Sequence, residues 1–238
     1  MLILLAIIAL AVRSGGANLL FVLAVSPSAF LLWYFYNADK YKRESIRLLG
    51  STFLLGAFFS IVAAVVESTY LEPSSNAGIF AVFVYFLFGI GLVEEFAKFL
   101  SVRIFAYRSP HFDEPMDGIV FGVAAGLGFA TIENLFYVFQ NGVGAAILRA
   151  MVSVPAHAFW GAIMGFYLGE AKVRGRPWIA LYGLGIAVLL HGLFDTFATI
   201  LPNVVGLIAI LGLVWIVYFK VVKKEIAEAE NESPYRPT

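Results

Sequence analysis

The chain has 238 residues, of which 61% are hydrophobic and only 13% are charged, and its mean hydropathy is +0.88. A soluble domain carries about 25% charged residues, so this composition predicts an all-α, polytopic transmembrane helix bundle. The formal net charge of zero argues against nucleic acid as a partner, and the absence of cysteine excludes disulfides, thiolate zinc sites and cysteine proteases.

The first segment, residues 1–17, begins with a bare apolar run, Leu2–Val12, followed by Arg13 and small residues. Its topology stays open between a short extra hydrophobic span, an interfacial segment and a cleaved signal peptide. Residues 18–222 form one predicted transmembrane domain. The polar tail, residues 223–238, alternates in charge and is predicted to fray from a helix into disorder.

Apolar runs close to the ~20 residues that a helix needs to cross a bilayer recur along this domain. The third run is long, and we expect it either to kink at Gly89 and Gly91 or to be tilted. We predict about seven spans, at residues 19–36, 46–71, 78–105, 118–140, 148–169, 178–200 and 204–219.

The connecting loops differ sharply in basic residues. Loop 37–47, the ends of loop 103–108, loop 170–177 and the C-terminal segment 220–238 hold 13 of the 16 Lys and Arg residues, whereas loops 72–77, 141–147 and 201–203 hold none. Basic loops of multi-span proteins face the cytoplasm. We therefore expect a multi-pass cell-membrane protein whose basic loops and C-terminal tail are cytoplasmic.

Ionisable or strongly polar side chains occur within four predicted spans, where they are costly if they face lipid. At ~1.5 Å rise per residue, they lie roughly 15–22 Å from the cytoplasmic ends, so we expect them to meet. By contrast, Glu67 near the outer end of the second span is expected at the interface. The buried set is Glu94, Glu95 and Lys98 in the third span, Glu133 and Asn134 in the fourth, His157 in the fifth, and His191 and Asp195 in the sixth.

Two features of local spacing support this convergence. Lys98 lies three and four residues after the paired glutamates, and Asp195 lies four residues after His191, so each pair shares a helix face. A carboxylate at that position can orient an imidazole, and two adjacent carboxyls suit general acid–base chemistry. Small residues at four-residue spacing predict close packing of the fourth and fifth spans; they are Gly118, Gly122 and Gly126, and Gly161, Gly165 and Gly169.

Five separated segments resemble the PrsW family of intramembrane proteases, which is distantly similar to the CAAX prenyl endopeptidases. The resemblance covers the chain from about the first span to the sixth, in order. The segments are the run GLVEEFAK at 91–98, HFDEPMDGIVFG at 111–122, FATIEN at 129–134, RAMVSVPAHAFWGAIMGFYLG at 149–169 and LLHGLFD at 189–195.

This resemblance implies a membrane-embedded endopeptidase that cuts single-pass membrane proteins. The best-known family role is the first, site-1-type cut of a membrane-bound anti-sigma factor. Carried over by position, the resemblance implies five catalytic residues: Glu94 and Glu95 as the paired glutamates, Glu133, and the histidines His157 and His191.

We favour a mechanism in which Glu94 or Glu95, with a slight preference for Glu95, activates water. His191, held by Asp195, and His157 with Asn134 would bind water and stabilise the oxyanion. No cofactor is required. The alternative is a metalloprotease in which His157, His191 and Glu133 hold zinc.

Two other classes of protein remain as alternatives. Buried carboxylates and histidines also form proton relays, which would suit a proton-coupled transporter. The small-residue faces would also suit a non-catalytic scaffold for partner helices. The expected environment is the lipid bilayer in each case, and the oligomeric state is left open.

Overall fold

The computed structural model describes residues 16–70, 72–74, 76–201 and 203–237, and within these residues every regular element is helical. The predicted all-α bundle is therefore confirmed. The open topology of segment 1–17 falls almost entirely outside the described residues.

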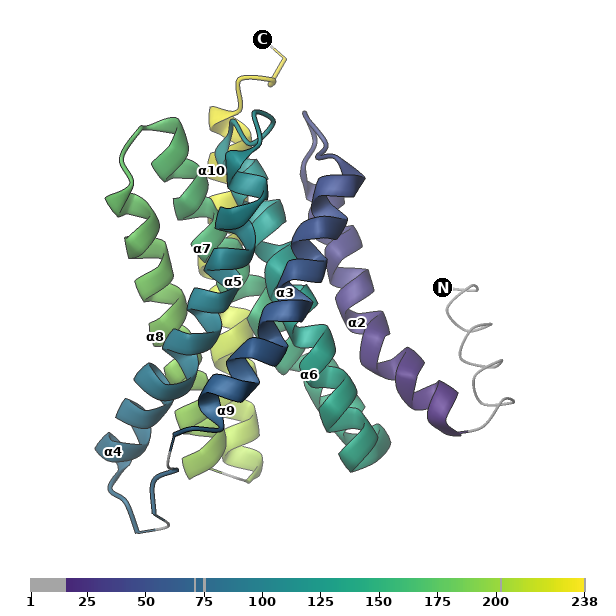
Figure 1. Ribbon diagram of the computed structural model, residues 1–238, viewed down its shortest axis with the longest axis vertical. Helices are drawn as coiled ribbons and strands as arrows, with labels where there is room; N and C mark the ends of the chain where they lie inside the picture. The colour runs from purple at the N-terminus through teal and green to yellow at the C-terminus, as the bar shows by residue number, and fades with distance from the viewer. Residues whose placement is uncertain (1–15, 71, 75, 202, 238) are drawn as a thin grey trace.

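The helices pack side by side around two central ones, α6 and α7 (Figure 1). In chain order the elements are α2 (Gly16–Ala38), α3 (Ile46–Glu67), α4 (Ile79–Val84), the π-helix η1 (Tyr85–Gly91), α5 (Leu92–Ile104), the short 3₁₀-helix η2 (Ala106–Arg108), α6 (Pro115–Met151), α7 (Ser153–Val173), α8 (Trp178–Ile200), α9 (Val204–Val217), the π-helix η3 (Tyr218–Val222) and α10 (Lys223–Glu232).

Six helical stretches of the described chain are long and apolar enough to cross a membrane. The longest, Pro115–Val173, has 59 residues and crosses twice, because the backbone of Gly142 leaves the helical conformation with φ 74°. Glycine adopts positive φ without steric cost. The predicted number of about seven spans is therefore close.

The reversal at Gly142 lies inside the predicted loop 141–147, but the turn is shorter than that loop. Arg149 contacts Glu133 at 3.0 Å, although 16 residues of straight helix would separate the two by ~24 Å. The chain therefore turns back close to Gly142, and the following helix starts before position 148. The pair Asn141-Gly142 is a turn signal in the sequence, whereas the residues after it do not show that the helix resumes at once.

The α6–α7 pair forms the centre of the bundle and packs backbone to backbone. A Cβ atom on Gly118, Gly122 or Gly126 would collide with a backbone carbonyl of α7, at Gly165, Gly161 and His157 respectively. This confirms the predicted packing of the two small-residue faces. Residues early in α6 lie against residues late in α7, so the two helices run antiparallel. This direction is expected for a chain that reverses at Gly142.

The third crossing is irregular where the sequence predicts a kink. Its middle is the π-helix η1, which ends at Gly91, next to the start of α5. A side chain at Gly91 or Gly192 would crowd the backbone between η1 and α8. Single π-helical turns inside α-helices often lie beside functional residues.

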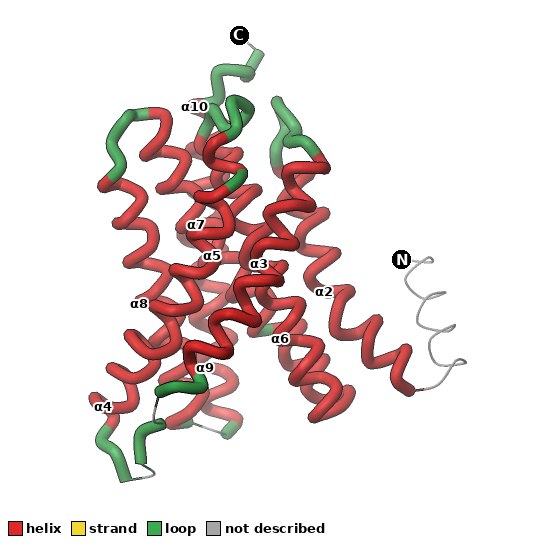
Figure 2. The backbone as a smooth tube through the Cα atoms, viewed as in Figure 1, coloured by secondary structure: helices red, strands yellow, loops and turns green. Residues whose placement is uncertain are grey.

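Loops and turns lie mostly at the two ends of the bundle (Figure 2). The four basic regions meet at one end, where Lys42 pairs with Asp113 at 2.6 Å and Lys172 donates to the Tyr107 carbonyl. The tail, predicted to fray, is helical as α10 to Glu232, and the Tyr235 hydroxyl donates to Asp113 at 2.8 Å.

Candidate active site

The paired glutamates of α5 are buried and share one ammonium group. The Lys98 Nζ lies 2.6 Å from Glu95 Oε1 and 3.2 Å from Glu94 Oε2, and the lysine side chain is fully buried. The spacing of three and four residues places all three on one helix face, as the sequence predicts. The arrangement supplies one positive charge for two carboxylates, so further partners are needed.

Those partners come from α8. His191 Nδ1 lies 2.7 Å from Glu95 Oε1, and its Nε2 lies 3.3 Å from Asp195 Oδ2 and 3.6 Å from Glu94 Oε2. The imidazole is therefore held from both sides by carboxylates. Asp195 lies where the i,i+4 spacing predicts, whereas the bond to Glu95 crosses between helices and closes the site.

The second half of the site comes from α6 and the crossing that follows. His157 Nε2 lies 2.9 Å from Glu133 Oε2, and the Arg149 guanidinium donates to the same oxygen at 3.0 Å. Arg149 also donates to Asn134 Oδ1 at 2.6 Å, and the Asn134 amide donates to the Ala24 carbonyl of α2. Asn134 is thus engaged in positioning Arg149.

A helix break precedes His157. Pro155 lacks an N–H group, and its ring would clash with the carbonyl four residues earlier, that of Met151. The chain accordingly leaves helical geometry at Val152, and the Trp215 indole donates to the freed Met151 carbonyl at 3.2 Å. The break positions His157 in the second turn of α7.

The two halves meet at the centre of the bundle. The rings of His157 and His191 contact edge to face with centroids 5.6 Å apart. Single donor atoms of Glu94, Glu133 and His157 lie within 4.8 Å of one another. The buried residues of α5, α6, α7 and α8 therefore converge, as their similar predicted depths require.

A cavity of about 910 Å³ reaches this cluster. Its polar wall includes Glu94, Glu133, His157, His191 and Asp195, whereas Glu95, Lys98 and Asn134 are not among the lining residues. Its mouth includes Glu72, Pro73, Ser74 and Ala77, in the loop between α3 and α4. That loop lies at the end of the bundle opposite the basic loops (Figure 1).

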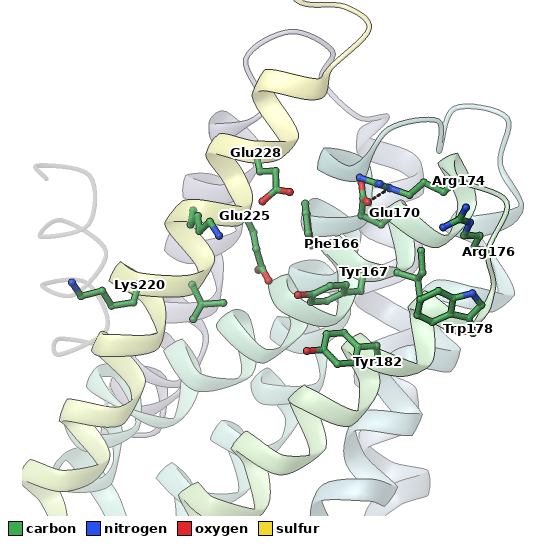
Figure 3. A pocket seen from close by; sticks show the side chains of 13 residues that line it. Phe166, Tyr167, Glu170, Arg174, Arg176, Trp178, Tyr182, Lys220, Glu225 and Glu228 are labelled. Atoms are coloured by element: carbon green, nitrogen blue, oxygen red, sulfur yellow. Dashed lines mark ion pairs between the residues drawn. The ribbon is translucent and has the colours of Figure 1, made fainter.

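Another hollow, of about 660 Å³, lies at the basic end between α7, α8 and α10 (Figure 3). Its lining includes Tyr167, Tyr182 and Glu225, together with the Glu170–Arg174 ion pair. No histidine lines it, so it lacks the paired carboxylates and imidazoles of the central cluster.

Several residues that line the cavity were not predicted as site residues from the sequence, among them Glu67, Tyr137 and Arg149. Glu67 lines the cavity rather than lying simply at the interface, and Tyr137 and Arg149 line it as well. One signal was available for Arg149, since it is a basic residue near the outer end of a span, on the side whose loops contain no Lys or Arg. A positive charge in that place needs a buried partner.

The fold and the cavity define a multi-span membrane protein with a hydrolase-like cluster of acids and imidazoles in its core. The profile of the PrsW family intramembrane metalloproteases matches residues 44–222. Protease PrsW of Bacillus subtilis (strain 168) is 39% identical over 75% of this chain and 82% of its own length. Protease PrsW of Halalkalibacterium halodurans is 37% identical over 72% and 80%, and that of Clostridioides difficile (strain 630) is 36% identical over 74% and 77%.

No solved structure matches the chain. The matched relatives nevertheless cover most of the chain and most of their own length, and the chain belongs to the PrsW family of intramembrane proteases. It is a membrane peptidase, and this assignment favours neither the transporter nor the scaffold interpretation.

Proposed function

We propose that this protein hydrolyses a peptide bond of a membrane-anchored protein, in a site-1-type cut of an anti-sigma factor or a similar single-pass regulator. The observation that carries the proposal is the cavity, which brings water-sized space to Glu94, Glu133, His157 and His191 inside the bundle. Hydrolysis within a membrane needs such a space, a base and groups that stabilise the oxyanion.

We assign the role of the base to Glu94 rather than to Glu95. Glu94 lines the cavity, whereas Glu95 is fully buried and its Oε1 is held by Lys98 and His191. Glu95 is then a positioning residue that fixes the imidazole. This replaces the slight preference for Glu95 that the sequence alone suggests.

In the proposed reaction, Glu94 accepts a proton from water while the water oxygen bonds to the substrate carbonyl carbon. The carbonyl oxygen becomes an oxyanion, to which His157 donates a hydrogen bond from Nδ1, its ring nitrogen without a partner, while His191 stays held between Glu95 and Asp195. Glu94 then delivers the proton to the nitrogen as the C–N bond breaks. The products are one carboxylate terminus and one amine terminus.

A metal-dependent form of this reaction is the second candidate, favoured by one observation. Glu94, Glu133 and His157 bring two carboxylate oxygens and one imidazole nitrogen within 4.8 Å of one another, a donor set that suits zinc. This set contains Glu94 in place of His191, which the sequence-based alternative had included. A bound zinc would act as a Lewis acid and would make its water more acidic.

Cleavage of a single-pass substrate in reconstituted vesicles tests the function. Glu94→Gln should lower the rate by at least ~100-fold while leaving the thermal unfolding midpoint close to that of the parent. Gly185→Ala serves as the matched control, because a Cβ atom at Gly185 meets nothing within 4 Å. Full activity in Glu94→Gln would overturn the assignment of the base.

The metal content of the purified protein distinguishes the metal-dependent mechanism from the metal-free glutamate mechanism. Zinc bound at one equivalent, lost in Glu133→Gln, together with inhibition by 1,10-phenanthroline that added zinc reverses, would establish the metal-dependent form. Full activity of metal-free protein, with Glu94→Gln inactive, would establish the metal-free glutamate mechanism.

The orientation of the chain is part of the proposal. The basic end is assigned to the cytoplasm, so the cavity mouth at loop 72–77 opens to the outer side, where a site-1-type cut is expected. The chain has no cysteine. A membrane-impermeant maleimide applied to intact cells should therefore label Ser74→Cys and not Arg176→Cys, and the reverse result would invert the topology.

A further inference from the structure

A second group of buried carboxylates lies at the basic end of the bundle, away from the catalytic cavity. Asp39 and Glu44 come from the connection between α2 and α3, and Glu114 and Asp117 come from the start of α6. Each is at most 3% exposed. Carboxylates are rarely buried this deeply unless they are paired or bind a metal.

The oxygen atoms of this group point to a shared ligand. One carboxylate oxygen from each of Asp39, Glu114 and Asp117 lies within 4.8 Å of the others. Asp39 Oδ2 and Asp117 Oδ1 are buried and have no hydrogen-bond partner. The remaining oxygen of Asp117 caps α6, because it accepts the Asp113 and Glu114 backbone N–H groups at 2.7 and 3.0 Å.

Glu44 provides an independent observation, since it is not one of the three clustered residues. Both of its carboxylate oxygens are buried without a hydrogen-bond partner, and it interacts electrostatically with Asp117 and Asp39. A buried acid beside Asp117 and Asp39 adds a further negative charge to the same small volume. Such an arrangement is unfavourable unless positive charge enters it.

The protein supplies too little positive charge to balance these four acids. Lys42 forms the ion pairs with the group, at 3.8 Å from Glu44 and 3.4 Å from Asp117. The same ammonium makes its shorter contacts, at 2.6 Å, with Asp113 and with the His111 carbonyl. The α6 N-terminus contributes only about half a charge.

We propose that Asp39, Glu114 and Asp117, with Glu44 beside them, bind one hard divalent cation, Mg²⁺ or Ca²⁺. An all-oxygen, carboxylate-rich site suits these two ions and lacks the nitrogen and sulfur ligands that zinc favours. The ion would join the α2–α3 connection to the start of α6. It therefore acts as a structural link at the end of the bundle opposite the cavity mouth.

Thermal unfolding of the purified protein in detergent tests this site. After chelator treatment, titration with MgCl₂ or CaCl₂ should raise the unfolding midpoint by roughly 5 °C in a saturable manner. Isothermal titration calorimetry should give about one ion per chain. The ion with the lower dissociation constant identifies the preferred ligand.

Asp39→Asn combined with Glu114→Gln should abolish the saturable shift. In chelator, this variant should unfold at or above the midpoint of the parent, because it removes charges that repel one another. Two controls should retain the shift: Gly185→Ala, where a Cβ atom meets nothing within 4 Å, and Glu94→Gln in the catalytic cavity. No saturable shift in the parent, or an undiminished shift in the double variant, would overturn the proposal.

Discussion

Two groups of buried carboxylates lie in this bundle, and they differ in how their charge is balanced. In the catalytic cluster, Lys98 and Arg149 contact three of the acids, and two histidines contact the same acids. In the acidic cluster of Asp39, Glu44, Glu114 and Asp117, one lysine makes only the longer ion pairs. The first group is balanced by the fold itself, and the second requires charge from outside.

The comparison indicates that the source of the positive charge that balances buried acids depends on where in the bundle they lie. Helix faces inside the membrane carry their own counter-charges, because no dissolved ion is freely available there. Loops at the end of the bundle are in contact with water, so an ion can complete their charge. Variants that remove one basic residue from each cluster should show whether the fold or a dissolved ion supplies the balancing charge.

Lys98→Met should have the largest effect. It leaves Glu94 and Glu95 buried without their shared ammonium group, and breaking a buried pair in this way costs about 3–5 kcal/mol. We expect little folded protein, measured by size-exclusion yield and thermal unfolding in detergent, and no rescue by Mg²⁺ or Ca²⁺. The exposed Lys220→Met is the control, and a stable Lys98→Met protein would contradict the comparison.

Lys42→Met should have a smaller effect that a cation reverses. The variant removes the one lysine that pairs with the acidic cluster, so its unfolding midpoint in chelator should fall by a few °C. Saturating Mg²⁺ or Ca²⁺ should restore most of this loss, and the shift caused by the cation should exceed that of the parent protein. A loss that no cation reduces would mean that both clusters are balanced in the same way.

Arg149→Gln should lower the cleavage rate by about 10- to 100-fold without unfolding the protein, because partners that orient a site's ligands have effects of this size. Glu133 would keep its contact with His157 but lose the guanidinium. The rate in vesicles is the measurement. Arg149→Lys should recover part of the activity, and equal rates for the parent and Arg149→Gln would remove this arginine from the site.

Asp195→Asn should have the smallest effect, a fall in rate of about 10-fold, since Glu95 continues to hold Nδ1 of His191. The change should also displace the pH profile of the rate, because a negative charge beside the imidazole is lost. An unchanged profile with a reduced rate would indicate a purely structural role for Asp195.

The sequence predicts those parts of the protein that depend on helical spacing. The contacts of Lys98 with Glu94 and Glu95, the contact of Asp195 with His191, and the glycine packing of α6 on α7 all follow from three- and four-residue intervals. Their meeting at one depth follows from the rise of a helix and the length of each span.

Contacts that depend on where the chain turns were not predictable in this way. Arg149 reaches Glu133 because the chain reverses at Gly142 and the helix resumes at once, whereas the sequence predicts a loop as far as residue 147. Likewise, Asp39 and Asp117 are far apart in the sequence, and no helical period relates them. Both cases depend on tertiary packing, which overrides local preference.

The backbone contact between Gly122 and Gly161 has a consequence for the substrate. Because α6 and α7 touch without intervening side chains, side-chain rotamers cannot change the distance between the two backbones, so Glu133 and His157 extend from a rigid pair of helices. A transmembrane substrate hides its carbonyl oxygens in helical hydrogen bonds. The unwinding that exposes a scissile bond must therefore occur in the substrate, so segments with helix-weakening glycine or proline should be cut fastest.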